Sequence, residues 1–199
     1  MRAVLNWQTL LAAFFILLPT VLGFYHGVRG KIVIASPEMD DPNFSKTVLY
    51  MFEHDWYRAR AVVLNRPYTD LTVLPSHIVN LGVPLYWGGP VEDRESVHVV
   101  DLCQEGRRPV VGELDHLISS NSDFVRDLRD RQDCYRVYVG YAGWGMAQFE
   151  LERERGGWKT ISYQPFVFEN SLLPDLFWEA LMPYTDDKEK KEIGQRQKT

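Results

Sequence analysis

Short β-rich hydrophobic runs alternate irregularly with amphipathic helical segments along the chain. Clusters of β-branched and aromatic residues between turn signals predict strands at residues 31–36, 47–53, 61–65, 97–100, 135–140 and 158–162. Apolar residues at helical spacing predict helices within 113–131, interrupted at 119–122, and at 71–79, 146–155 and 174–182. Because these elements do not alternate as regular β-α-β units, we predict an α+β fold rather than a doubly wound parallel sheet.

Three stretches between these elements combine turn residues with side chains that suit ligand contacts. Residues 37–44 contain two aspartates between two prolines, 85–91 a pair of glycines, and 140–148 three glycines with a tyrosine and a tryptophan. Carboxylates can hold a cation, and glycines let backbone amides approach a ligand. Each stretch also has a structural explanation, namely an Asx turn, a tight turn and a close-packed corner.

The first residues form a unit separate from the predicted domain. Residues 10–18 are an unbroken apolar run, and Arg2 is the only acidic, lysine or arginine residue before Arg29. This pattern predicts a signal peptide over 1–23, and the alternative is an uncleaved anchor that uses residues 3–24 as a membrane tether. From this segment we expect an exported, periplasmic or membrane-associated protein.

Length and charge indicate one acidic globular domain. The 199 residues include 22 basic and 27 acidic ones, giving a formal net charge of −5, and 45% of them are hydrophobic. We expect the folded domain over 28–184 and a charged, flexible tail over 185–199. Because the chain is acidic and lacks a basic stripe, direct binding to nucleic acid is disfavoured.

The chain contains two cysteines, Cys103 and Cys134, on separate predicted elements. In an oxidising compartment the two can form a disulfide, while two buried free thiols are the alternative. Because sequence alone does not give the distance between the two sulfurs, both states stay open.

Common catalytic motifs are absent from the sequence. There is no phosphate-binding P-loop, no GxGxxG, no HExxH and no GxSxG motif. The five histidines and two cysteines have no zinc-ligand spacing. We therefore expect neither a cofactor nor a metal site, and His54, at the end of a predicted strand, is the one candidate for a catalytic base.

A series of short motifs, in order along the chain, resembles the AlgH/YqgE family of bacterial proteins. The matching segments are Ala35–Pro37 with Asp40–Pro42 and Phe44, Glu53-His54, Val63–Pro67, Leu85-Tyr86 with Gly88–Val91, and Gly140–Gly145 with Gln148 and Glu150. The resemblance implies a single α+β domain in which a bent mixed sheet forms a pseudo-barrel with flanking helices. It implies no particular reaction, although members are often labelled transcriptional regulators.

The chain departs from the family pattern in two places. Where the family usually has Gly-Gln-Leu, this chain has Ala147, Gln148 and Phe149, and we expect these bulkier residues to narrow any pocket there. Family members usually look cytoplasmic, whereas the apolar residues 10–24 of this chain predict export or a membrane tether.

We predict a non-enzymatic binding or regulatory domain with a groove for a small anionic ligand or a peptide. The candidate groove residues are Asp40, Asp41, Asn65, Arg66, Gly88, Gly89, Tyr141, Gly143, Trp144 and Gln148. Arg66 suits an anionic group, and Tyr141 and Trp144 supply apolar walls. The expected partner is a small ligand or another protein.

Two alternative functions remain open at this point. The first is a hydrolase in which His54 is the base and Asp40 or Asp41 orients it or holds a cation. The second is a role in transcription, which the acidic charge makes indirect.

Overall fold

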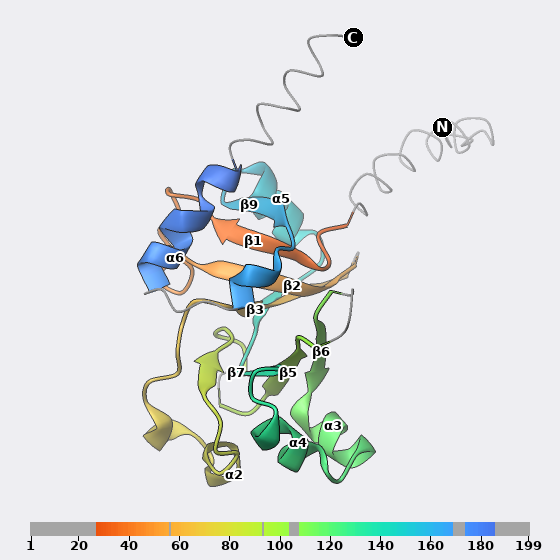
Figure 1. Cartoon of the computed structure of the whole chain (residues 1–199). Coiled ribbons are helices and arrows are strands. Elements are labelled where there is room, and N and C mark those ends of the chain that lie inside the picture. Colours follow the sequence, from red (N-terminus) through yellow and green to blue (C-terminus); the bar gives the residue numbers. More distant parts are fainter. Residues whose placement is uncertain (1–26, 56, 93, 104–107, 169–173, 186–199) are drawn as a thin grey trace, which may run out of the picture.

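The computed structural model describes residues 27–55, 57–92, 94–103, 108–168 and 174–185 (Figure 1). The predicted signal peptide or anchor, and residues 186–199 of the predicted tail, lie outside these ranges. Thr185, which we expected to begin the tail, is buried, and its hydroxyl donates a hydrogen bond to the carbonyl of Met182. No helix in the described part of the chain is long and apolar enough to cross a membrane.

Five antiparallel strands form the first sheet, in the order β8-β3-β2-β1-β9. They are β1 (Lys31–Ala35), β2 (Val48–His54), β3 (Ala59–Val63), β8 (Ala142–Trp144) and β9 (Trp158–Ser162). In β1, Ile32 and Ile34 face one hydrophobic cluster while Val33 and Ala35 face another. The strand is therefore buried on both faces, which explains its unbroken apolar sequence.

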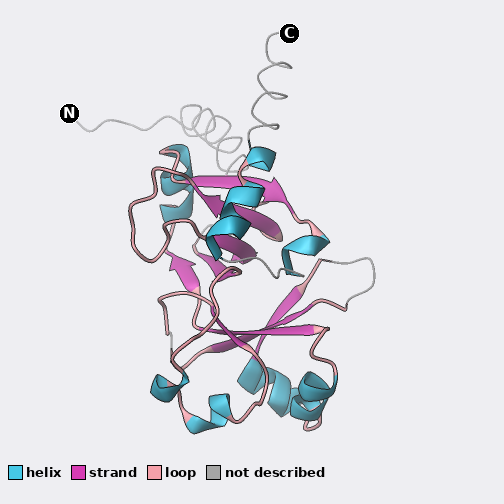
Figure 2. Ribbon diagram, turned by 60° about the vertical axis from the view of Figure 1, so that its left-hand side comes forward, coloured by secondary structure: helices cyan, strands magenta, loops and turns pink. Residues whose placement is uncertain are grey.

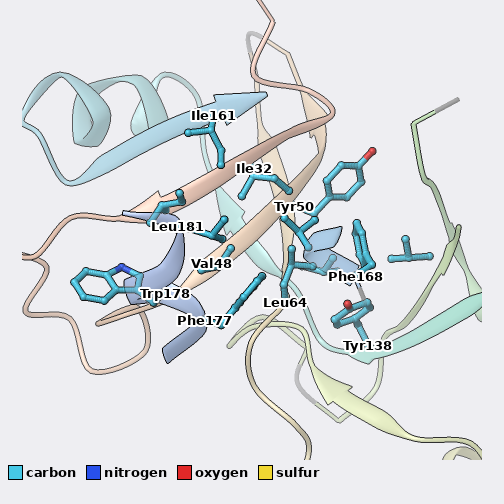
Figure 3. Packing of buried hydrophobic residues seen from close by; sticks show 14 residues of the cluster. Ile32, Val48, Tyr50, Leu64, Tyr138, Ile161, Phe168, Phe177, Trp178 and Leu181 are labelled. Carbon is cyan, nitrogen blue, oxygen red and sulfur yellow. The ribbon is translucent and has the colours of Figure 1, made fainter. Parts of the chain in front are cut away.

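The two faces of the first sheet are covered by different helices (Figures 1 and 2). Figure 3 shows the cluster on one face, where Phe177, Trp178 and Leu181 of α6 (Pro174–Leu181) pack with residues of β1 and β2. The short 3-10 helix η2 (Pro165–Phe168) contributes Phe168 to the same cluster. On the other face, α5 (Gln148–Glu154) buries Phe149.

A second, four-stranded sheet has the order β4-β7-β5-β6. Its strands are β4 (Leu85–Trp87), β5 (Val97–Asp101), β6 (Val110–Glu113) and β7 (Tyr135–Val139); β4 runs parallel to β7, and the other pairs are antiparallel. A third hydrophobic cluster joins β4, β5 and β7 to α2 (Ser76–Val79), α3 (Leu114–Ser120) and α4 (Phe124–Asp130). The 3-10 helix η1 (Leu71–Val73) precedes α2.

The predicted single α+β domain is confirmed, but its sheet arrangement differs from what the family resemblance implies. The described strands form two sheets instead of one bent sheet, and their pairing closes no barrel. Three strands, β4, β6 and β8, were not predicted, because β4 and β8 have only three residues each and β6 carries a glycine and no buried residue. Each strand and helix that the sequence predicted is present.

Cys103 and Cys134 form a disulfide, with 5.1 Å between their Cα atoms. The bond joins the residues after β5 to those before β7, and the sequence separation between the two cysteines is 31 residues. Of the two states that the sequence left open, the structure has the bonded one. The bond closes a loop that contains β6, α3 and α4.

Reduction of this disulfide is expected to lower the free energy of unfolding by about 3–4 kcal/mol, because the loop regains chain entropy in the unfolded state. Urea unfolding with and without dithiothreitol measures this change. In a Cys103→Ser/Cys134→Ser variant dithiothreitol should have no effect, and equal dithiothreitol sensitivity of both proteins would contradict the assignment.

Candidate functional site

A cleft of about 560 Å³ lies between the loop after β1 and helix α5. We call it the acidic cleft. Its lining includes five of the predicted groove residues, Asp40, Asp41, Gly143, Trp144 and Gln148. Four carboxylates line it (Glu38, Asp40, Asp41 and Glu152), against two basic side chains (Arg155 and Lys159). The cleft is therefore acidic, unlike the anion-binding groove that the sequence suggested.

Three aromatic rings form the floor of the acidic cleft. Trp144 and Trp158 are in edge contact, with ring centroids 5.7 Å apart. The ring centroid of Phe44 lies 5.5 Å from that of Trp158 and 6.1 Å from that of Trp144. Both tryptophans are at most 4% exposed, whereas Phe44 is only half-buried. The apolar surface available to a ligand is therefore supplied mainly by Phe44 and the neighbouring Met39.

Glu152 holds this floor in place. Its Oε2 accepts hydrogen bonds from the indole N–H groups of Trp144 (2.9 Å) and Trp158 (2.8 Å), and its Oε1 accepts one from the side-chain amide of Gln148 (2.9 Å). The Gln148 side chain in turn accepts a hydrogen bond from the backbone N–H of Gly145. Because Glu152 accepts hydrogen bonds from three donors, its role is to hold the cleft together. The other three acids of the cleft, Glu38, Asp40 and Asp41, are exposed to solvent.

The loop that carries those acids is ordered by an Asx turn, as one of our explanations predicted. The Asp41 side chain accepts a hydrogen bond from the backbone N–H of Asn43 at 2.8 Å. The backbone carbonyl of Asp41 also accepts from the N–H of Ser45 at 2.7 Å. Asp40 and Asp41 are exposed and face the cleft from this turn.

The expectation that Phe149 narrows the pocket is wrong. Phe149 is fully buried beneath the cleft, in contact with the rings of Trp144 and His54. Ala147, the N-cap residue just before α5, has a φ of 57°, a left-handed conformation that glycine adopts without strain. Ala147 and Phe149 thus affect the backbone and the core, and neither residue lines the cleft.

Asn65 and Arg66 lie outside the acidic cleft and have structural partners. The Asn65 side chain is buried; it accepts a hydrogen bond from the N–H of Val48 and donates one to the carbonyl of Lys46. Arg66 donates to Ser45 and Thr47, and its guanidinium lies 5.1 Å from the ring centre of Trp87. Burial lowers the pKa of Arg66.

Gly88 and Gly89 also serve the structure. A Cβ on Gly88 would lie 2.1 Å from the carbonyl oxygen of Gly140, and one on Gly89 would lie 2.2 Å from the carbonyl carbon of Tyr141. Gly88 accepts a backbone hydrogen bond from Val63 of the first sheet and donates one to Val139 of the second. The glycine pair therefore permits close contact where the two sheets meet.

Tyr141 lies beside a different cavity, which sequence analysis did not identify. Its ring contacts His98, with centroids 5.4 Å apart, and the guanidinium of Arg60, at 5.6 Å. His98 and Arg60 line a cavity of about 390 Å³ between the two sheets. His98 occupies a buried position in β5, and sequence offers no sign that distinguishes it from an ordinary core residue.

His54 pairs with Glu150, and both side chains are almost completely buried, at 5% and 8% exposed. The hydrolase hypothesis named Asp40 or Asp41 as the partner of His54, but the carboxylate that contacts its Nε2 belongs to Glu150. His54 lines none of the three cavities considered, of about 280, 390 and 560 Å³. In the described residues, no group of three or more His, Cys, Asp or Glu side chains is arranged to hold a metal ion.

Comparisons with known proteins agree on one family. A family model described as AlgH-like matches residues 32–187. A UPF0301 protein from Jannaschia sp. is 29% identical over 170 residues, covering 78% of this chain and 86% of the relative. A UPF0301 protein from Ralstonia nicotianae is 32% identical over 166 residues, covering 77% of this chain and 86% of the relative.

Two solved structures share the fold. The solution structure of the AlgH protein from Pseudomonas aeruginosa has a TM-score of 0.59 and 22% identity, covering 80% of this chain and 89% of that chain. The crystal structure of a protein from Corynebacterium diphtheriae has a TM-score of 0.59 and 19% identity, with coverages of 79% and 86%. At these identities the likeness concerns the fold alone.

Replacing Glu152 tests the floor of the acidic cleft. In a Glu152→Ala variant the two buried indole N–H groups lose their acceptor, so we expect the free energy of unfolding to fall by about 2–4 kcal/mol. Urea unfolding followed by tryptophan fluorescence measures it. Glu154→Ala, on the exposed face of the same helix, is the matched control and should change stability little; equal losses in both variants would contradict the role of Glu152.

The buried His98 predicts a loss of stability in acid. Burial lowers its pKa to about 4 from the usual 6.5, while nearby Glu113 raises it and Arg60 lowers it. The unfolded chain therefore binds a proton below pH 6.5 that the folded chain does not bind until about pH 4. Above pH 6.5 both states are neutral at this residue and it contributes no pH dependence.

Between pH 6.5 and 4, this difference is expected to lower the free energy of unfolding by about 3 kcal/mol. Urea unfolding of the native protein and of His98→Gln across this pH range isolates the contribution. The gap between their stabilities should narrow as the pH falls, and a constant gap would contradict the depressed pKa.

Proposed function

The chain belongs to the AlgH-like family, and we propose that it is a non-enzymatic binding domain whose acidic cleft holds a short cationic peptide segment. The observation that carries this proposal is the gathering of Glu38, Asp40 and Asp41 beside the apolar surface of Phe44 and Met39. Opposite charge gives such a surface its preference for basic partners and speeds association.

The backbone beside the cleft favours a peptide over a compact cation as the ligand. Gly143 lies in β8, the edge strand of the first sheet, and is exposed at the cleft wall. An edge strand presents backbone groups that can pair with an extended chain, a common mode of peptide recognition. A peptide with alternating basic and apolar side chains meets both the carboxylates and Phe44.

The competing functions have less support. Arg66 suggested a small anion as the ligand, but this side chain lies outside the cleft and donates hydrogen bonds to Ser45 and Thr47. A hydrolase built on His54 lacks an open site around the His54–Glu150 pair. An indirect role in transcription requires binding to another protein and no contact with DNA bases. The peptide proposal is compatible with such a role.

A six-residue peptide of alternating lysine and leucine is expected to bind the full chain, while the same peptide with glutamate in place of lysine does not. In heteronuclear NMR the lysine peptide should shift the backbone amides of Gly143 and Gln148 saturably. A Glu38→Gln/Asp40→Asn variant removes two exposed charges without touching the floor, so we expect about tenfold weaker binding.

The control for this prediction is Asp130→Asn/Glu154→Gln, which removes two exposed charges of the same sign outside the cleft. It should bind the lysine peptide as tightly as the unmodified chain. Equal binding of the lysine and glutamate peptides, or equal weakening by both double variants, would contradict the acidic cleft as the site.

We further propose that the domain works in an oxidising compartment. The disulfide between Cys103 and Cys134 supports this, because such bonds persist mainly outside the reducing cytosol. The apolar run at residues 10–18 is consistent with export or a membrane tether.

Alkylation of free thiols in fractionated cells, with N-terminal sequencing of the recovered chain, tests the compartment. We expect the cysteines to resist alkylation and the chain to appear in the exported or membrane fraction. A reduced chain in the cytosolic fraction would contradict the proposal and leave the peptide-binding test unaffected.

A further inference from the structure

The cavity of about 390 Å³ between the sheets is separate from the acidic cleft. It is lined by residues of β2, β3, β5 and β6, together with Arg29 and His116, and shares no lining residue with the cleft. We call it the inter-sheet cavity. Its volume is within the range of small-ligand sites.

One buried polar atom at this cavity has no partner. His98 is 1% exposed, and its Nε2 is the only buried side-chain nitrogen or oxygen in the described residues without a hydrogen bond. The ring is held between Phe52 and Tyr141, with centroids 5.3 and 5.4 Å away, and its Nδ1 is 3.4 Å from the hydroxyl of Ser96. Leaving a buried polar atom without a hydrogen bond is unfavourable, so this nitrogen points to a ligand partner.

Arg60 places a fixed positive charge beside His98. Its Nε donates to Glu53 at 2.5 Å, and its guanidinium lies 5.5 and 5.6 Å from the ring centres of Phe52 and Tyr141. Glu53 is also bound by Arg58 at 2.7 Å, so the negative charge of Glu53 is shared between two arginines. Glu53 therefore neutralises the positive charge of Arg60 only in part.

Glu113 places a negative charge next to Arg60 in the lining of the same cavity. It is the cross-strand partner of His98 in the antiparallel pair β5–β6. Its side chain is 59% exposed, and its carboxylate reaches Arg60 only at 3.5 Å, beyond ordinary hydrogen-bond distance. A small ligand can replace this long contact with two shorter ones, one to each charge.

We propose that the inter-sheet cavity is a second binding site, for a small zwitterion such as a free amino acid. Its carboxylate contacts Arg60, its ammonium contacts Glu113, and one of these two groups also forms a hydrogen bond with Nε2 of His98. A carboxylate alone leaves Glu113 facing a second negative charge, and a cation alone leaves Arg60 facing a second positive charge. The zwitterion matches the charges of Arg60 and Glu113 at once.

The test uses the full chain with three probes at roughly millimolar concentration, namely L-alanine, acetate and methylammonium. Imidazole ¹⁵N NMR reports Nε2 of His98, and isothermal titration calorimetry gives the affinity. We expect L-alanine to shift the His98 resonance saturably and to bind at least about tenfold more tightly than either single-charge probe.

Glu113→Gln removes one exposed charge and should weaken L-alanine about tenfold while sparing acetate. Asp115→Asn, exposed on the neighbouring α3 and outside the cavity lining, is the control and should leave all three affinities unchanged. The proposal is overturned if L-alanine leaves His98 unshifted, or if acetate or methylammonium binds as tightly as L-alanine. None of these outcomes bears on peptide binding at the acidic cleft.

Discussion

The contact between Gly88 and Gly140 is the constraint on which the rest of the structure depends. A Cβ at Gly88 would lie 2.1 Å from the Gly140 carbonyl oxygen, so only glycine permits the two segments to meet. Through Gly88 the backbone of β3 in the first sheet is bonded to the end of β7 in the second. Directly after Gly140 the chain enters Tyr141, whose ring contacts His98 of the inter-sheet cavity, and then β8, whose Gly143 and Trp144 line the acidic cleft.

The two sites differ in how their charges are used. In the acidic cleft the carboxylate of Glu152 accepts hydrogen bonds from the two tryptophans of the floor and from Gln148. The exposed acids on the loop after β1 remain available to a partner. In the inter-sheet cavity two opposite charges, Arg60 and Glu113, lie 3.5 Å apart and line the same space as a buried, unpaired imidazole. The first arrangement suits an extended basic chain, and the second suits a compact molecule with both charges.

Sequence predicted the elements of this fold better than their arrangement or the site. Runs such as Lys31–Ala35 are apolar because both faces are buried, and that signal is local. Strand β8 was missed because three residues around Gly143 have no strand pattern of their own; pairing with β3 makes them a strand. The grouping of strands into two sheets likewise depends on contacts between distant segments.

Only half of the predicted groove residues line the acidic cleft, because contacts between distant segments also decide which side chains meet there. Asp40 and Gln148 were identified because unusual turn and corner residues accumulate around them, and the structure brings them to one cleft. Arg66 carries an equally suggestive charge, but it lies outside the cleft, where its Nη2 donates to Ser45 and Thr47. Glu152 and His98 were missed because their importance comes from partners remote in sequence, which no local pattern reveals.

Urea unfolding of Gly88→Ala tests the central structural claim most directly. If Gly88 joins the two sheets, the added methyl group forces their backbones apart, and the free energy of unfolding falls by at least about 3 kcal/mol. Gly145→Ala, whose added Cβ would have no neighbour closer than 4.0 Å, should stay near the stability of the unmodified chain. A Gly88→Ala protein as stable as Gly145→Ala would contradict the claim.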